Sequence, residues 1–317
     1  MSRVESRESR AVRPGGILGS RPSSLVPRPA TRAFTLVEIL VVVVLMALIV
    51  LALMAVFSST QAAFRASITQ TDVLEGGRSV MGMFKSDLES LTPSLGRSNR
   101  FVGAVNFYAN TNQYQYQSGS APLVQSLVGV NDPNTRRTNV LENFFVLSRQ
   151  NMTWYGAGYA VDASTNGFYS LYRFATNHPV MSTDPAFIFT NEFRNFLTAI
   201  TNGSHLMDGV VHLTVRAYDI NGVWLTNGYA NLTNLTVKNV RFLPTTLGET
   251  GFYMFSNTLP ASVEIQLGLL EDRTLQRAES LANNPTAQMA YLSNHVGQVH
   301  LFRQRVWIRN VDPSAYQ

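Results

Sequence analysis

The sequence predicts an α+β protein in which one long hydrophobic N-terminal helix packs on an antiparallel β-sheet domain. Three observations predict this class. Residues 39–57 are apolar without interruption, an apolar stripe at helical spacing continues to residue 91, and alternating strand patterns dominate residues 207–309. Only 14% of the 317 residues are charged, against about 25% in an ordinary soluble domain, and cysteine is absent. The composition therefore excludes a disordered chain, a disulfide framework and a thiolate metal site.

Residues 1–33 are a predicted basic leader peptide. They hold seven arginines and two glutamates, which accounts for the whole net charge of +5. The remaining residues carry 18 basic and 18 acidic side chains, so they have no overall positive field that would attract phosphates. We therefore expect no nucleic-acid partner.

Residues 34–57 are the predicted transmembrane or filament-core helix. The 19 apolar residues from Ile39 to Phe57 would span about 28 Å as a helix, close to the thickness of a bilayer. The arginine-rich leader places the N-terminus in the cytoplasm and exports the remainder. A cleaved secretory signal is the alternative. The apolar region of such a signal is shorter than this 19-residue run, and the candidate cleavage sites near Ala55 or Ala63 fit its small-x-small pattern poorly.

Glu38 is the only charge among residues 34–57, and a charge within an apolar helix needs a partner. The sequence Ala33-Phe34-Thr35-Leu36-Val37-Glu38 resembles the prepilin processing motif of type IV pilins and type II secretion pseudopilins. The resemblance implies a pilin-like fold, cleavage by prepilin peptidase between Ala33 and Phe34, and N-methylation of Phe34. It also implies that Glu38 pairs with the N-terminal amine of a neighbouring subunit during assembly. The family normally has glycine where this chain has Ala33. The alternative to an assembly role is that Glu38 lies at the depth of the lipid headgroups and faces lipid or water.

Residues 58–91 are predicted to continue the helix with an amphipathic face toward the domain. The apolar stripe consists of Leu74, Met81, Phe84, Leu88 and Leu91. Gly76-Gly77 is the expected weak point, since glycine lowers helix stability. The segment from Arg78 to Leu91 is similar to the minor pseudopilin J class.

Residues 92–206 are predicted as a variable region of loops, strands and helices. A short strand is expected at residues 101–108, and a long surface loop should follow up to about residue 143. Asp184-Pro185 then predicts the start of a helix that stops at Asn202-Gly203. We expect its apolar face to pack in the core rather than bind a partner; that face consists of Phe189, Phe193, Phe196, Leu197 and Ile200.

Residues 207–309 are predicted to be β-rich and pseudopilin-like, and residues 310–317 to be a tail. Strands are expected at residues 211–218, 223–225, 235–243, 262–269 and 299–308, and short helices at 273–281 and 285–292. Asn221-Gly222 predicts a hairpin turn. This region resembles the J class in Tyr218-Asp219, Gly222-x-Trp224, Leu259-Pro260-Ala261-Ser262-Val263 and the final strand with Arg303 and Arg305. The arrangement of anchor and strands also looks similar to components of cassettes called Verru_Chthon.

No residue pattern predicts catalysis. The sequence has no P-loop, no Gly-x-Ser-x-Gly and no His-Glu-x-x-His, so we expect no enzyme and no cofactor. His205, Asp208 and His212 have a spacing that a metal could use, but Gly203 and Gly209 would break the helix needed to align them.

Two further patterns, a candidate calcium site and a candidate nucleic-acid surface, have simpler structural explanations. The oxygen-rich clusters at residues 131–134 and 271–272 match no recognisable calcium loop, so no metal is expected. The final strand places Arg303, Arg305 and Arg309 on one face with Trp307. A solvated strand face explains this alternation better than nucleic-acid binding.

The sequence as a whole is therefore interpreted as a non-enzymatic minor pilin-like or pseudopilin subunit. The resemblance implies storage in the bacterial inner membrane with a periplasmic domain, contact with membrane lipid, and assembly with other pilin or pseudopilin subunits. It also implies an inner-membrane assembly platform with its ATPase. One alternative is that the filament is a type IV pilus or a DNA-uptake pilus rather than a secretion filament. The alternative from another class is an exported binding or enzymatic domain held by an uncleaved anchor.

Overall fold

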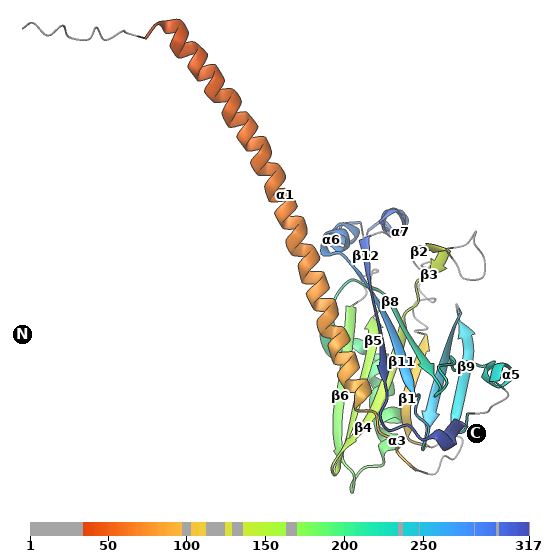
Figure 1. Ribbon diagram of the computed structural model, residues 1–317. Helices are drawn as coiled ribbons and strands as arrows, with labels where there is room; N and C mark the ends of the chain where they lie inside the picture. The colour runs from red at the N-terminus through yellow and green to blue at the C-terminus, as the bar shows by residue number, and fades with distance from the viewer. Residues whose placement is uncertain are drawn as a thin grey trace, which may run out of the picture. The chain divides into compact units, whose positions relative to one another are not determined.

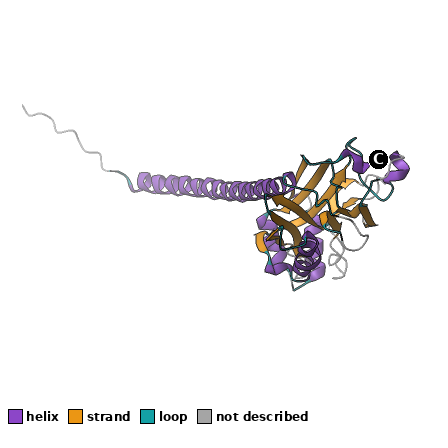
Figure 2. Cartoon of the chain, turned by 90° about the horizontal axis from the view of Figure 1, so that it is seen from below, coloured by secondary structure: helices purple, strands orange, loops and turns teal. Residues whose placement is uncertain are grey.

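A computed structural model describes residues 34–96, 103–111, 124–128, 136–162, 170–233, 237–246, 248–281, 283–295 and 298–316. The chain divides between Thr60 and Gln61 into two compact units. A long N-terminal helix and an antiparallel sheet domain confirm the predicted α+β class (Figure 1). Figure 2 shows the strands in the middle of the second unit and short helices at its periphery.

Helix α1, Leu36–Glu89, is 54 residues long and begins and ends two residues inside the predicted span. Side chains of residues 34–60 are exposed, and α1 is the one helix among the described residues that is long and apolar enough to cross a membrane. No break occurs at the two glycines where the sequence predicted a weak point.

The second half of α1 buries a stripe that differs from the predicted one at its start. Met81, Phe84, Leu88 and the following Leu91 are buried as expected, but Leu74 is only half-buried. Val73, Gly77 and Val80 are buried as well. A Cβ atom on Gly77 would overlap the ring of Phe302, so this glycine lets α1 approach the domain closely.

A seven-stranded antiparallel sheet has the order β7-β6-β5-β4-β1-β10-β9. Its strands are β1 Val105–Thr111, β4 Glu142–Gln150, β5 Thr153–Asp162, β6 Ser170–Pro179, β7 Ser204–Met207, β9 Val240–Thr246 and β10 Glu249–Phe255. In its centre, Phe107 lies opposite Val146 on β4, and Val105 lies opposite Phe255 on β10.

For this sheet, two predicted strands exist with shifted bounds, and other strands were not predicted. The strand expected at residues 101–108 is β1, which lies later, and the strand expected at 235–243 is β9, which begins at Val240. The predicted surface loop up to residue 143 includes the small sheet of β2, Val124–Val128, and β3, Arg136–Thr138, as well as the start of β4. Strands β4, β5, β6, β7 and β10 had no predicted counterpart.

A second sheet has the order β12-β11-β8. Strands β8, Val210–Tyr218, β11, Ser262–Leu270, and β12, Val299–Trp307, confirm the predicted strands to within one residue at each end. Residues 223–225 form no strand, because Trp224 makes only a single bridge to Tyr218 across the turn at Gly222. On the side of β8 that does not pair with β11, Leu213 N donates a hydrogen bond to Val140 O at 2.8 Å.

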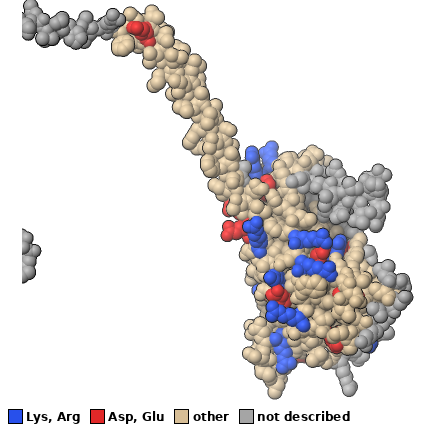
Figure 3. All heavy atoms as spheres, in the orientation of Figure 1, with Lys and Arg blue, Asp and Glu red and all other residues tan. Residues whose placement is uncertain are grey.

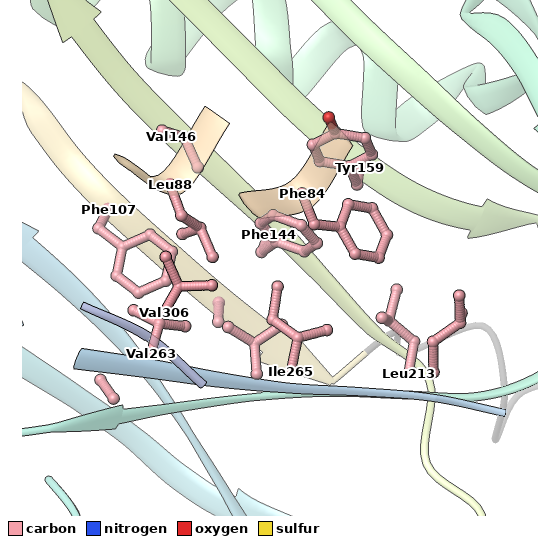
Figure 4. Close-up of a cluster of buried hydrophobic side chains, with 14 of the residues drawn as sticks. Phe84, Leu88, Phe107, Phe144, Val146, Tyr159, Leu213, Val263, Ile265 and Val306 are labelled. Carbon is pink, nitrogen blue, oxygen red and sulfur yellow. The ribbon is translucent and has the colours of Figure 1, made fainter. Parts of the chain in front are cut away.

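The main core lies where side chains of α1 and of both sheets point toward one another (Figure 4). Phe84 of α1 meets the rings of Phe144 and Tyr159 edge-on, with centroids 5.2 and 4.6 Å apart. Asp87, one turn later, accepts hydrogen bonds from Tyr159 Oη at 2.5 Å and Arg173 Nη2 at 3.0 Å. These contacts fix the C-terminal end of α1 on β5 and β6.

A helical segment covers the opposite face of the large sheet. It consists of α3, Pro185–Phe187, the π-helical turn η1, Ile188–Phe193, α4, Arg194–Thr198, and η2, Ile200–Asn202. Asp184 caps it as predicted, by accepting a hydrogen bond from Ala186 N at 2.9 Å. Its predicted apolar face packs in a second core, with Leu197 only partly buried.

Short elements complete the second unit. Helices α6, Asp272–Glu279, and α7, Pro285–Asn294, confirm the two predicted helices and pack on β8 and β11 through Leu275 and Leu292. Helix α5 spans Tyr229–Thr233. The predicted tail includes a helical turn, η4, Pro313–Tyr316, and Tyr316 donates a hydrogen bond to Leu259 O.

Candidate processing and assembly site

The residues around the predicted cleavage point form the first turn of α1. Glu38 Oε2 accepts hydrogen bonds from Thr35 N and Thr35 Oγ1, both at 2.9 Å. Glu38 N donates in return to Thr35 Oγ1 at 3.3 Å. This reciprocal pattern is a capping box, in which Thr35 occupies the N-cap position and Glu38 the third helical position.

The capping role of Thr35 was not among the sequence predictions. The signal was present, because a threonine followed three residues later by glutamate, just before an apolar run, is the sequence signature of a capping box. The cap satisfies two groups at the start of α1 that would otherwise lack partners in an apolar environment.

Of the other predicted site residues, the structure describes Phe34. Phe34 directly precedes Thr35, and its side chain is 79% exposed. Ala33 lies outside the described residues. Glu38 therefore lies one helical turn from the predicted new N-terminus, with its carboxylate directed back toward it.

One carboxylate oxygen of Glu38 is still available. Both donors from Thr35 go to Oε2, and no other described residue donates to Oε1. A carboxylate can accept about four hydrogen bonds, so the cap leaves room for a cationic donor from outside the chain. The arrangement can thus hold a helix end and bind an amine at the same time.

The spacing of His205, Asp208 and His212, which a metal could use, is explained by local hydrogen bonds. His205 Nε2 lies 2.9 Å from Asp208 Oδ1, whereas His212 is buried in β8 and its Nδ1 accepts from Val140 N at 3.1 Å. Burial lowers the pKa of His212 to about 4, so this imidazole is neutral at physiological pH. In the described part of the chain, no group of three or more metal-ligating side chains could hold an ion.

The structure describes one of the two oxygen-rich clusters, residues 271–272. Glu271 Oε1 pairs with His300 Nε2 at 3.0 Å. Residues 131–134 lie outside the described residues.

Comparison with known proteins identifies the N-terminal segment. A family model for the prokaryotic N-terminal methylation motif matches residues 28–56, a range that includes Ala33, Phe34 and Glu38. No curated protein and no solved structure matches the chain. The segment is therefore a pilin-like prepilin motif, and it leads directly into a helix that fits a membrane anchor.

Proposed function

We propose that the chain is a non-enzymatic minor pilin-like or pseudopilin subunit. Prepilin peptidase cuts between Ala33 and Phe34, Phe34 is N-methylated, and the subunit joins a type II secretion-like or type IV pilus-like filament. The observation that carries the proposal is the methylation motif at residues 28–56, continuous with a membrane-length helix whose first turn presents Glu38. The large second unit, residues 61–317, suits a minor subunit because it would crowd a repeating shaft.

The chemistry of Glu38 supports a role in assembly. Cleavage creates a new amine on Phe34, and an amine or a carboxylate buried among apolar helices is stable only when its charge is compensated. The free oxygen of Glu38 can accept the amine of a neighbouring subunit without loss of the Thr35 cap. Pairing between subunits therefore compensates both charges.

The distribution of charge supports the proposed location. The arginine-rich leader stays in the cytoplasm, the apolar first part of α1, residues 34–57, is held in the inner membrane, and the second unit lies in the periplasm until assembly. The proposed partners are the peptidase, other pilin or pseudopilin subunits, membrane lipid, and the assembly platform with its ATPase.

The first experiment determines the mature N-terminus. The full chain is co-expressed with an active prepilin peptidase or with a catalytically dead one, and its intact mass and N-terminal peptide are measured. We expect a chain that begins at methylated Phe34 only with the active enzyme. A chain that retains Arg32-Ala33, or one that is cut near Ala55 or Ala63 with either enzyme, would leave an anchored or secreted domain instead.

A second experiment separates the charge of Glu38 from its capping role. Glu38→Gln keeps an amide oxygen that can accept from Thr35, whereas Glu38→Ala removes both functions. We expect both variants to be cut normally and both to lose at least about tenfold in filament incorporation, equivalent to ~1.4 kcal/mol. Thr35→Ala, the control, keeps the carboxylate and should incorporate. Normal incorporation of Glu38→Gln would show that capping alone matters.

A further inference from the structure

The outer face of the three-stranded sheet carries an unusual set of side chains. The register places Tyr218, Ser262 and Trp307 in one row across the strands. The next row is Arg216, Glu264 and Arg305, and Arg303 and Leu301 follow along β12. We name this surface the arginine–aromatic face; it comprises Arg216, Tyr218, Ser262, Glu264, Leu301, Arg303, Arg305 and Trp307. Figure 3 shows several basic side chains on the visible side of the second unit, with acidic ones beside some of them.

Large apolar side chains on this face are exposed. The exposed fraction is 65% for Trp307 and 46% for Leu301, and Ile220 in the adjacent turn is 49% exposed. Tryptophan, tyrosine and arginine are the residues enriched at the energetic centres of protein interfaces, whereas an edge strand that only faces water usually carries lysine. The composition thus favours a protein contact.

Arg305 is held in place by stacking. Its guanidinium carbon lies 4.0 Å from the centroid of the Tyr218 ring and 5.4 Å from that of Trp307. Its Nε donates to Ser262 Oγ at 2.9 Å. The two terminal nitrogens have no hydrogen-bond acceptor among the described residues, and Arg305 is exposed. A guanidinium fixed in this way presents its fork to a carboxylate with little loss of side-chain entropy.

The other charges on the face are already paired. Arg216 Nε donates to Glu249 Oε2 at 2.9 Å, and Arg303 Nη2 donates to Glu264 Oε2 at 2.8 Å. Burial favours a raised pKa for Glu264, but hydrogen bonds from Arg303 and Gln266 outweigh it and lower the pKa, so Glu264 is ionised. In the described residues, Arg305 and the nearby exposed Arg309 have no acidic partner, which leaves a local excess of positive charge.

We propose that the arginine–aromatic face binds an acidic segment of a partner protein, with a carboxylate of that segment held in the fork of Arg305. Trp307 and Leu301 would cover apolar side chains of the same segment. A protein fits better than a nucleic acid, because Glu249 and Glu264 neutralise two of the three arginines of the face and no continuous track for phosphates remains. The face is formed by residues between Arg216 and Trp307 and does not depend on cleavage at Ala33.

The direct test measures binding of defined probes to the full chain in detergent. The probes are a labelled ten-residue peptide of alternating Glu and Val, its Gln–Val counterpart, and a ten-nucleotide oligothymidylate. We expect the Glu peptide to bind at least about tenfold more tightly than either other probe. Arg305→Gln should lose most of that preference, and Arg305→Lys, which keeps the charge but not the fork, should lose part of it.

Arg149 provides a matched control. It also stacks on a tryptophan, with its guanidinium carbon 5.5 Å from the Trp154 ring, and its Nε donates to Asn151 O at 3.1 Å. Arg149→Gln should leave peptide binding unchanged. Equal binding of the Gln peptide, tighter binding of the oligothymidylate, or an equal loss in Arg149→Gln would overturn the proposal.

A cellular test identifies the occupant. A photo-crosslinking residue is placed at Leu301 on the face, or at Met181, which is 86% exposed elsewhere. We expect only position 301 to crosslink a protein segment with clustered Asp and Glu, Arg305→Glu to abolish that crosslink, and reversal of the partner's carboxylates to Lys to restore it. Crosslinks to nucleic acid, no crosslink, or no effect of Arg305→Glu would count against the proposal.

Discussion

Glu142 on β4 is a fully buried carboxyl group that supports the edge of the neighbouring sheet. Its Oε2 accepts from Val215 N at 2.5 Å, while its Oε1 has no hydrogen-bond partner among the described residues. Burial raises the pKa of Glu142 well above its ordinary value, and the nearby Glu249 raises it further. The hydrogen bond from Val215 and the charge of Arg216 oppose this shift without cancelling it. Glu142 is therefore protonated in the folded protein under conditions in which an exposed glutamate is ionised.

Glu142→Gln tests this assignment through the pH dependence of stability. The pKa of Glu142 is higher in the folded protein than in the unfolded chain, where it is near 4.5. The carboxyl group of Glu142 therefore contributes fully to stability below that pH, and the contribution is lost as pH rises. We expect Glu142→Gln and the wild type to have the same free energy of unfolding near pH 4. Toward pH 8 the variant should become more stable than the wild type, by at most ~1.4 kcal/mol per pH unit. Denaturant unfolding of the full chain in detergent measures it.

Glu279→Gln is a suitable control, since Glu279 is exposed on α6. Its difference from the wild type should not grow with pH. If the difference between Glu142→Gln and the wild type were flat or shrank toward pH 8, Glu142 would have to be ionised in the folded state.

At this scale, the sequence predicted residues whose chemistry is local. The Phe34 to Glu38 motif and the Asp184 cap are read within a few positions. Glu142 and Val215 are 73 residues apart, and nothing in the sequence near Glu142 indicates their contact. The stacking of Arg305 between two rings likewise depends on strands that meet only in the fold.

The glycines of α1 illustrate how one element balances helix formation against packing. A Cβ atom on Gly77 would overlap Phe302 and lie 2.9 Å from Leu269 Cδ1, whereas a Cβ on Gly82 would meet nothing within 4 Å. Alanine is the better helix former at both positions. The two positions should therefore respond in opposite directions.

We expect Gly77→Ala to lower the free energy of unfolding by about 1–3 kcal/mol through overpacking. Gly82→Ala should raise it by about 0.5–1 kcal/mol, because only the helix preference changes. Chemical denaturation of both variants measures the difference. A gain in both would mean that Phe302 moves aside at little cost.

Strands differ in how far their patterns reveal them. Strands β8, β11 and β12 were found from alternation, turns and flanking signals, and on β12 the arginines point outward while Val306 points inward. Strands β4 and β5 lie between the main core and the helical segment 185–202, so both of their faces are largely buried. Burial on both faces removes the polar alternation on which a strand prediction depends.

For the whole molecule, the division at residue 60 predicts an independently folding second unit. Side chains of residues 34–60 are exposed, and the described core begins at Val73. A chain that starts at Gln61 should be soluble without detergent and should melt within about 5 °C of the full chain. Circular dichroism and thermal unfolding test this. Aggregation or loss of strand signal would show that the apolar part of α1 is needed for folding.

The fold class could be predicted because the anchor and the strand-rich C-terminal region have strong local patterns. The order of the large sheet could not. It places β1 between β4 and β10 and joins strands from both sides of residue 207, and such long-range pairing leaves no periodic signal in the sequence.

The pairing of β1 with β10 also determines when the domain can close during synthesis. Asn106 and Ser256, which are joined by a hydrogen bond, are 150 residues apart, while β4 and β5 are joined by a short turn. Long loops close late because their entropy must be repaid by contacts that do not yet exist. At about 5–20 residues per second, the edge of β1 that pairs with β10 therefore waits roughly 7–30 s for its partner strand. During that interval the nascent chain exposes strands that a chaperone can bind or a second nascent chain can mispair with.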